Sequence, residues 1–366
     1  MLPCDDLDLS GIGSCEVTNM KRKIKPILCF FAMGILILDT KTALQGASDG
    51  ITLCTKTVVP SLFPFIVLSM LLTSSLLGKR MVVLRPIGRL LRIPEGSESI
   101  WLIGSLGGYP VGAQSIGQAV KSGVLSQKDG RRMLCFCSNA GPSFIFGIGM
   151  GILGDIRLCF LVWLIHILSS ILVGILTPGK AESSAMPHTS PPLTLPQVIP
   201  KATATMAMIC GWVIVFRILL SLLQKWILIH IPEIFQILLS GVLELSNGCV
   251  CLAEAESMTP KILLFSIFLA FGGVCVAMQT HSAVADTEIT RWYLPAKLAQ
   301  GACSAIFSAV AAKRLFPAEA PVKPGWIIIC GICLISYHVL LRKNIDKKAL
   351  AFKPVMMYNG VSLHTR

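Results

Sequence analysis

The sequence predicts an all-α polytopic membrane protein with about ten membrane segments in two inverted repeats, built with broken or re-entrant helices. Three observations predict this class. The 366 residues are 54% hydrophobic and only 14% charged, whereas soluble domains carry about 25% charged residues. Apolar runs long enough to cross a bilayer recur along the chain. Short basic clusters separate those runs, as the topology rules for membrane proteins require.

The charge and cysteine patterns narrow the expected partners. The net charge is +13, but the basic residues form no continuous stripe, so no nucleic-acid partner is expected. We expect the lipid bilayer and a small anionic or polar substrate as partners, and a homo-oligomer is left open. No cofactor is expected. No metal site is expected either, because the C-x-C pairs Cys135-Cys137 and Cys249-Cys251 lack a histidine or second pair at zinc spacing.

The beginning of the chain reads as an extension followed by a membrane anchor. Residues 1–19 are acidic and unpatterned, and Met20 opens a basic segment that precedes the apolar stretch Pro26 to Leu38. A basic start before an apolar stretch is typical of a signal peptide or an uncleaved anchor. No small-residue cleavage site follows, which favours the anchor. Met20 is the expected start, with Met1 as the alternative.

The first membrane repeat is expected over residues 20–177. Its five expected segments are 26–38, an amphipathic and then apolar stretch over 39–77, 100–120, 133–153 and 158–176. A basic linker over 79–92 follows the second segment. Ile100–Val120, which is broken by glycines and a proline, either spans the membrane or re-enters as a hairpin. The basic loop 121–132 would lie outside in the first case and inside in the second.

The second membrane repeat is expected over residues 201–342. A linker rich in Pro, Ser and Thr over 178–200 precedes it, and a basic cytoplasmic tail over 343–366 follows it. The expected segments are 202–223, 226–251, 262–278, 296–312 and 326–341. With five crossings per half, the positive-inside rule places both termini in the cytoplasm and the linker outside.

Two segments of similar sequence suggest an internal repeat. Gly107–Ser115 and Gly272–Thr280 both read G-G-x-x-V-small-x-Q-S/T. An odd number of crossings per half makes such repeats inverted. Inverted repeats place substrate sites near the bilayer midplane, on broken helices.

The candidate binding residues lie where the backbone is expected to be irregular. In lipid, irregular backbone survives only where protein or water lines it. A proline at the start of a half-helix is favoured, and the free N–H groups and helix dipole there attract anions. The alternative reading of the glycines is close helix packing. The expected substrate-binding residues are Gly107, Gly108, Tyr109, Pro110, Gln114, Ser138, Asn139, Gly141, Pro142, Arg217, Glu244, Asn247, Gly272, Gly273 and Gln279.

Two ionisable residues stand out among these candidates. Arg217 lies within an apolar run, and an intramembrane arginine is by default a functional hypothesis. Its alternative role is snorkelling to the interface, because the end of its helix is close. Glu244 is either its counter-charge or a marker of the interface. His166 reads as a packed polar residue.

Transport is the function that these features favour. The chain has no nucleotide-binding loop and no H-E-x-x-H or G-x-S-x-G motif, so neither ATP-driven pumping nor enzymatic activity is expected. An intramembrane enzyme and a purely structural assembly factor are the alternatives.

Several blocks of sequence resemble a known family. They are Pro60–Phe65, Gly107–Ala113, Ser138–Pro142, Leu243–Gly248 and Phe271–Gln279. Together they resemble the YlbJ/SpoVV sporulation integral membrane proteins, in the nucleoside recognition or Gate-domain group related to concentrative nucleoside transporters. The resemblance covers roughly residues 20–342. It implies export of dipicolinic acid from the mother cell across the outer forespore membrane, with a nucleoside-type or other small metabolite, or a structural role in spore envelope assembly, as alternatives.

Overall fold

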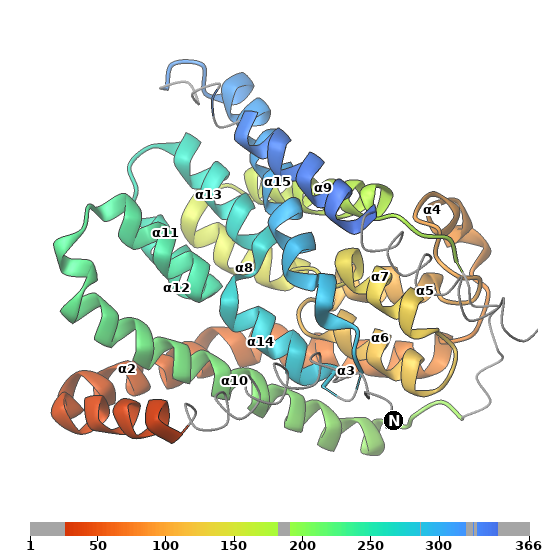
Figure 1. Ribbon diagram of the computed structural model, residues 1–366, viewed down its shortest axis with the longest axis horizontal. Helices are drawn as coiled ribbons and strands as arrows, with labels where there is room; N and C mark the ends of the chain where they lie inside the picture. Colours follow the sequence, from red (N-terminus) through yellow and green to blue (C-terminus); the bar gives the residue numbers. More distant parts are fainter. Residues whose placement is uncertain (1–25, 182–190, 286, 320–324, 326–327, 343–366) are drawn as a thin grey trace, which may run out of the picture.

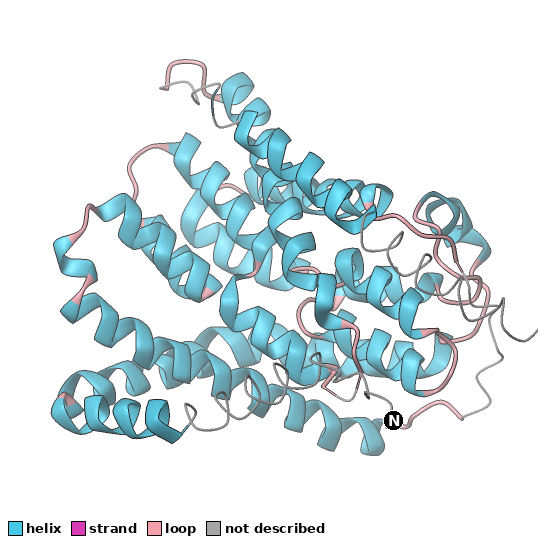
Figure 2. Cartoon of the chain, viewed as in Figure 1, coloured by secondary structure: helices cyan, strands magenta, loops and turns pink. Residues whose placement is uncertain are grey.

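The computed structural model describes residues 26–181, 191–285, 287–319, 325 and 328–342. All regular structure in this part of the chain is helical, and no strand occurs in it (Figure 2). The predicted all-α class is therefore confirmed. The predicted extension over 1–19 and the predicted tail over 343–366 lie outside the described residues.

Five helical stretches in the described part are long and apolar enough to cross a membrane. They are Thr40–Leu76, Gln127–Leu153, Ile156–Leu176, Leu195–Trp226 and Met258–Ala283. Shorter apolar helices cover Pro26–Leu38, Glu233–Leu243 and Ile328–Arg342. The chain therefore has the helices of an integral membrane protein. The count of ten segments and their inverted relationship stay predictions.

Two long helices run side by side along one edge of the molecule (Figure 1). The first is continuous and consists of α2 (Thr40–Leu53), the π-helical turn η1 (Cys54–Val58) and α3 (Val59–Leu76). The second is α10 (Leu195–Trp226). A Cβ atom on Gly50 would lie 3.0 Å from the Ile214 Cα, so the missing side chain lets α2 approach α10 closely.

The start of α10 shortens the predicted linker. Thr194 and Gln197 form a reciprocal capping box, in which each side chain accepts a hydrogen bond from the backbone of the other residue. A helix therefore begins at Leu195, whereas the composition predicted a linker as far as Pro200. Pro196 is compatible with that start, because a proline in the first helical turn loses no hydrogen bond.

Residues 98–121 form a helical hairpin. Helices α5 (Glu98–Leu106) and α6 (Val111–Lys121) pack against each other on either side of a turn over 107–110. A Cβ atom on Gly104 would lie 3.3 Å from the Gly112 Cα. Eight residues of straight helix would separate these two glycines by about 12 Å. The chain therefore doubles back, which corresponds to the re-entrant alternative for Ile100–Val120.

A second hairpin spans residues 233–253. Helices α11 (Glu233–Leu243) and α12 (Leu245–Ala253) meet at Glu244. A Cβ atom on Gly248 would lie 2.2 Å from the Gly241 Cα, so the two arms touch through bare backbone. The prediction of one membrane segment over 226–251 is therefore wrong. Glu244 ends α11 and caps α12, which starts a new helix in another direction.

Each hairpin is followed by an interrupted helix and then by a long one. Helices α7 (Gln127–Cys137) and α8 (Pro142–Leu153) are separated by residues 138–141, and α13 (Met258–Phe271) and α14 (Gly273–Ala283) by Gly272. Helices α9 (Ile156–Leu176) and α15 (Tyr293–Leu315) follow. The order of elements is thus the same in both halves.

This order corrects the predicted sequence repeat. Gly107–Ser115 lies in the first hairpin, whereas Gly272–Thr280 lies in the second interrupted helix. By order of elements, the counterpart of the first hairpin is the hairpin α11–α12. Both segments contain glycines at a helix interruption, but they do not occupy equivalent positions in this order.

Hydrogen bonds between helix ends show which segments lie at the same end of the molecule. His338 Nδ1 lies 2.7 Å from the Leu176 carbonyl oxygen, and the Arg92 side chain donates to the Ile175 carbonyl. The end of α9, the basic segment over 79–92 and the last described helix therefore lie at one end of the molecule. This proximity disagrees with the prediction that the linker starts on the side opposite to the end of the C-terminal helix, a prediction that counted the hairpin over 98–121 as a crossing.

Candidate binding site

The tips of the two hairpins pack onto the two helix interruptions in the interior. A Cβ atom on Gly108 would lie 3.0 Å from the Gly141 nitrogen, so the first tip touches the gap between α7 and α8. A Cβ atom on Gly273 would lie 3.2 Å from the carbonyl oxygens of Gly241 and Val242, so the second tip touches the gap between α13 and α14. The two hairpin tips and the two gaps between helices therefore pack inside the protein. Irregular backbone in a membrane protein survives only where protein or water lines it, and here protein lines it.

Most of the predicted site glycines serve close packing. A Cβ atom on Gly107 would lie 2.5 Å from the Ser69 Oγ. Gly108, Gly272 and Gly273 have φ angles of 79° to 80°, a left-handed conformation that favours glycine. Close packing, which was the alternative to substrate binding for the glycines, therefore explains why glycine stands at these four positions. Gly141 is also closely packed, but it lines a cavity as well.

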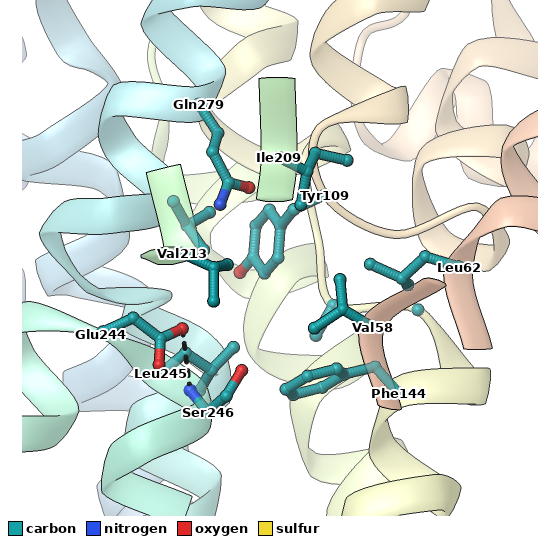
Figure 3. A pocket seen from close by; sticks show the side chains of 13 residues that line it. Val58, Leu62, Tyr109, Phe144, Ile209, Val213, Glu244, Leu245, Ser246 and Gln279 are labelled. Carbon is teal, nitrogen blue, oxygen red and sulfur yellow. Dashed lines mark hydrogen bonds between the residues drawn. The ribbon is translucent and has the colours of Figure 1, made fainter. Parts of the chain in front are cut away.

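The cavity lies between the two halves and has a volume of about 40 Å³ (Figure 3). A water molecule needs roughly 10–15 Å³ by this measure, so the cavity has room for only a few. Its walls are mostly apolar with a few polar groups, which is typical of ligand sites. The lining residues are Val58, Leu62, Tyr109, Ala140, Gly141, Phe144, Ile209, Val213, Glu244, Leu245, Ser246, Val276 and Gln279.

Glu244 supplies a carboxylate to one wall of the cavity. Its oxygens accept hydrogen bonds from the Ser246 nitrogen at 3.0 Å, the Asn247 nitrogen at 2.8 Å and the Asn247 Nδ2 at 2.8 Å. This is an N-cap arrangement, and it occupies the first amides of α12. Those amides are therefore not free for a ligand. Phe144, in the first turn of α8, lies on the other side of the cavity (Figure 3). Gly141, the N-cap of α8, also lines the cavity, so the positive end of that helix dipole borders the site.

The structure does not bring Arg217 into the cavity. Its guanidinium lies 3.2 Å from the Asp49 Oδ2 and 2.5 Å from the Asn247 Oδ1. It is 28% exposed, and it reaches Glu244 only through Asn247. Of the two roles left open for Glu244, a direct counter-charge for Arg217 is not what the structure shows. The two residues are linked by a chain of four side chains that starts on α2: Asp49, Arg217, Asn247 and Glu244.

Gln114 also lies elsewhere. Its Nε2 donates to the Thr205 Oγ1 at 2.9 Å in a separate cavity of about 160 Å³ beside α3 and α10. Gln279, by contrast, lines the central cavity and donates to the Cys275 sulfur at 3.4 Å. The segment Tyr109-Pro110 forms the first hairpin tip, with Tyr109 in the cavity wall and Pro110 directly before α6.

Ser138 and Asn139 lie behind the cavity, in contact with a lysine that the sequence analysis did not single out. Lys297 of α15 is fully buried, and its ammonium donates to the Ser138 carbonyl and, at 2.8 Å, to the Gln300 Oε1. Gln300 in turn donates to the Asn139 Oδ1 at 3.1 Å. His166 is also fully buried, and its Nε2 accepts a hydrogen bond from the Ala140 nitrogen at 3.0 Å.

A signal for Lys297 was present in the sequence. It is the one lysine or arginine in the run of small and apolar residues over 296–312. An ionisable residue inside such a run is a functional hypothesis by default. The neighbouring Gln300 makes this run less apolar than the run that contains Arg217.

The fold and the site define an α-helical integral membrane protein with a buried polar site between two hairpins and two interrupted helices. The chain is 25% identical over 334 residues to sporulation integral membrane protein YlbJ of Bacillus subtilis (strain 168), which covers 79% of this chain and 82% of that protein. This relative supports the assignment to the YlbJ-like family that the motifs predicted, and with it a membrane role in sporulation. No family model and no solved structure gives a significant match.

Proposed function

We propose that the protein carries a small polar anion across a bilayer, and that this anion is dipicolinic acid leaving the mother cell across the outer forespore membrane. The observation that carries the transport proposal is the central cavity, which both halves build jointly from interrupted helices. Transporter sites are typically built in this way. The choice of dipicolinic acid rests on the family resemblance.

We further propose that the two halves are inverted repeats. The Leu193 nitrogen donates to the Ser74 Oγ at 3.1 Å at one end of the molecule, and Lys225 pairs with Asp39 at 2.7 Å at the other. Helix α10 therefore runs antiparallel to α2–α3. The first hairpin follows α3 and the second follows α10, so the hairpins enter from opposite ends. This arrangement supports inversion across the membrane plane.

The size of the cavity supports a closed state in the transport cycle. A volume of about 40 Å³ is too small for an aromatic dicarboxylate. A substrate would need one hairpin tip to withdraw from the interrupted helix that it contacts. Withdrawal of either tip in turn would open the site to alternate ends, as in transporters whose repeats move against each other.

The test is exchange in vesicles that contain the purified full-length protein. Vesicles are loaded with unlabelled dipicolinate, and the entry of labelled dipicolinate is measured against protein-free vesicles. We expect entry that saturates with concentration and that unlabelled dipicolinate inhibits. In sporulating cells that lack the gene but still synthesise dipicolinate, we expect the compound to stay in the mother cell.

One observation favours a second candidate, a neutral nucleoside-type metabolite. The Glu244 carboxylate at the cavity wall would repel an anion but would accept hydrogen bonds from hydroxyl groups. The same vesicles, loaded with uridine, test this candidate. Exchange of uridine without exchange of dipicolinate would replace the proposed substrate. Exchange of neither compound, together with dipicolinate-poor spores of the deletion strain, would favour the structural role in envelope assembly.

A further inference from the structure

We propose that Lys297 is the residue that binds a carboxylate of the transported anion, and that the Tyr109 ring screens it from the cavity in the closed structure. This inference rests on the proposed transport of an anion and names the residue that would hold its charge. It replaces Arg217, which lies outside the cavity.

The first step is the charge of Lys297, which lacks a counter-ion nearby. Its side chain is fully buried, and its hydrogen-bond acceptors are two neutral oxygens, the Ser138 carbonyl and the Gln300 amide. Among the described residues, no carboxylate lies within 4.0 Å of the ammonium. A buried charge with neutral partners is costly, and membrane proteins retain such groups mainly for function.

The second step concerns the other groups around the ammonium. Its Nζ lies 5.3 Å from the ring centroid of Tyr109 and 5.7 Å from that of Tyr293, in cation–π contacts. The remaining titratable groups near it carry no negative charge in their ordinary protonation states: Tyr109, Tyr293, Cys135, Cys137 and His166. An anion is therefore the partner that this environment lacks.

The third step is the route from the cavity to Lys297. The Tyr109 ring lines the cavity and also contacts the ammonium. Tyr109 belongs to the first hairpin tip, so withdrawal of that tip would uncover the ammonium. The N-terminus of α8, close to Gly141, would add partial positive charge on the same side. Glu244 lies across the cavity from Phe144 (Figure 3), so the site would have a positive and a negative side.

The experiment measures thermal unfolding of the purified full-length protein with and without dipicolinate. The variant is Lys297→Met, and the matched control is Lys313→Met, which changes an exposed lysine of the same helix. We expect dipicolinate to raise the Tm of the wild type and of the control. For Lys297→Met we expect an apparent affinity about tenfold to a hundredfold weaker, the loss typical of one charged hydrogen bond. Lys297→Arg keeps the charge and should retain part of the shift.

The ligand-free protein separates a binding role from a structural one. Removal of a poorly compensated buried charge should leave the ligand-free Tm of Lys297→Met unchanged or higher. A ligand-free Tm well below that of the wild type, with the dipicolinate shift retained, would show a structural lysine and overturn the inference.

Two further probes separate this inference from the proposed function. Isophthalate has the same two carboxylates without the ring nitrogen, and uridine is neutral. Equal stabilisation of wild type and Lys297→Met by both dicarboxylates would overturn the role of Lys297 and leave anion transport standing. Stabilisation of the wild type by uridine alone, or by none of the three compounds, would overturn both proposals.

Discussion

The Tyr109 hydroxyl donates a hydrogen bond of 2.9 Å to the carbonyl oxygen of Leu269. In a continuous helix that carbonyl would accept from the nitrogen of residue 273. Helix α13 ends at Phe271, and Gly272 and Gly273 both have φ angles of 80°, so the carbonyl is released from the helical pattern. The interruption in the second half thus creates the acceptor that anchors the hairpin tip of the first half.

Loss of this hydroxyl should loosen the hairpin tip. We expect Tyr109→Phe to lower the free energy of unfolding by about 1–2 kcal/mol, because the buried Leu269 carbonyl loses its partner. If the tip withdraws during transport, the variant should also exchange substrate faster. Chemical denaturation and vesicle exchange measure the two effects.

Tyr337→Phe is the matched control for this variant. The Tyr337 hydroxyl forms a buried hydrogen bond of 2.8 Å with Thr177, between the last helix and the end of α9, away from the cavity. A similar loss of stability with unchanged exchange is expected. If both variants change the exchange rate equally, the Tyr109 bond has no special role in opening.

The contact between Gly248 and Gly241, where the two arms of the second hairpin touch, should tolerate no side chain. A methyl group on Gly248 would lie 2.2 Å from the Gly241 Cα, so Gly248→Ala must push the two arms apart. We expect a loss of stability of about 1–3 kcal/mol or more. Gly147→Ala is the control, because a methyl group there meets nothing within 4 Å on an exposed face of α8. It should be neutral or stabilise by up to about 1 kcal/mol.

The sequence could predict the helix interruptions that glycines mark, but not the contacts between distant segments. Gly108 and Gly141 marked helix interruptions correctly, because glycine and proline within an apolar run have a local physical meaning. The fold around Glu244 was missed, because one acidic residue in an apolar run does not reveal that its side chain will cap a new helix. Lys297 and Ser138 meet across 159 positions of sequence. No local pattern predicts such a contact, so the place of Lys297 behind the cavity emerged only from the fold.

The charge of Glu244 should decide between the two candidate substrates. Glu244→Gln keeps an oxygen acceptor for the cap of α12 and removes a negative charge from the cavity wall. We expect tighter binding of dipicolinate, because a like charge is removed. If the substrate is uridine, loss of the charged acceptor should weaken binding instead. Thermal shifts with both compounds measure the difference, with the exposed Glu256→Gln as control.

Reporter fusions test the ends of the molecule. The contact between His338 and the Leu176 carbonyl places the end of α9 beside the last described helix. Fusions after Lys180 and after Arg342 should therefore report the same side of the membrane. A fusion after Glu256, between α12 and α13, should report the other side. Opposite sides for the first two fusions would restore the topology with five crossings per half.

Arg217 should affect stability more than the selection of the anion. Its guanidinium and the Asp49 carboxylate are 28% and 37% exposed, and such pairs contribute about 0.2–1 kcal/mol. We expect the double-mutant cycle of Arg217→Gln and Asp49→Asn to give a coupling in this range. Dipicolinate affinity should change by less than about tenfold, because a change of 1.4 kcal/mol is tenfold and the pair contributes less.

Comparing the dipicolinate-induced Tm shifts of Arg217→Gln and Lys297→Met decides which cation holds the anion. Arg217 reaches the cavity wall only through Asn247 and Glu244, whereas Lys297 contacts the ring that lines it. If Arg217→Gln abolishes the dipicolinate shift while Lys297→Met retains it, the anion is held from the α2–α10 side. The sequence-based choice of cation would then be right. If Lys297→Met alone abolishes the shift, the buried ammonium behind Tyr109 provides the charge that the substrate requires.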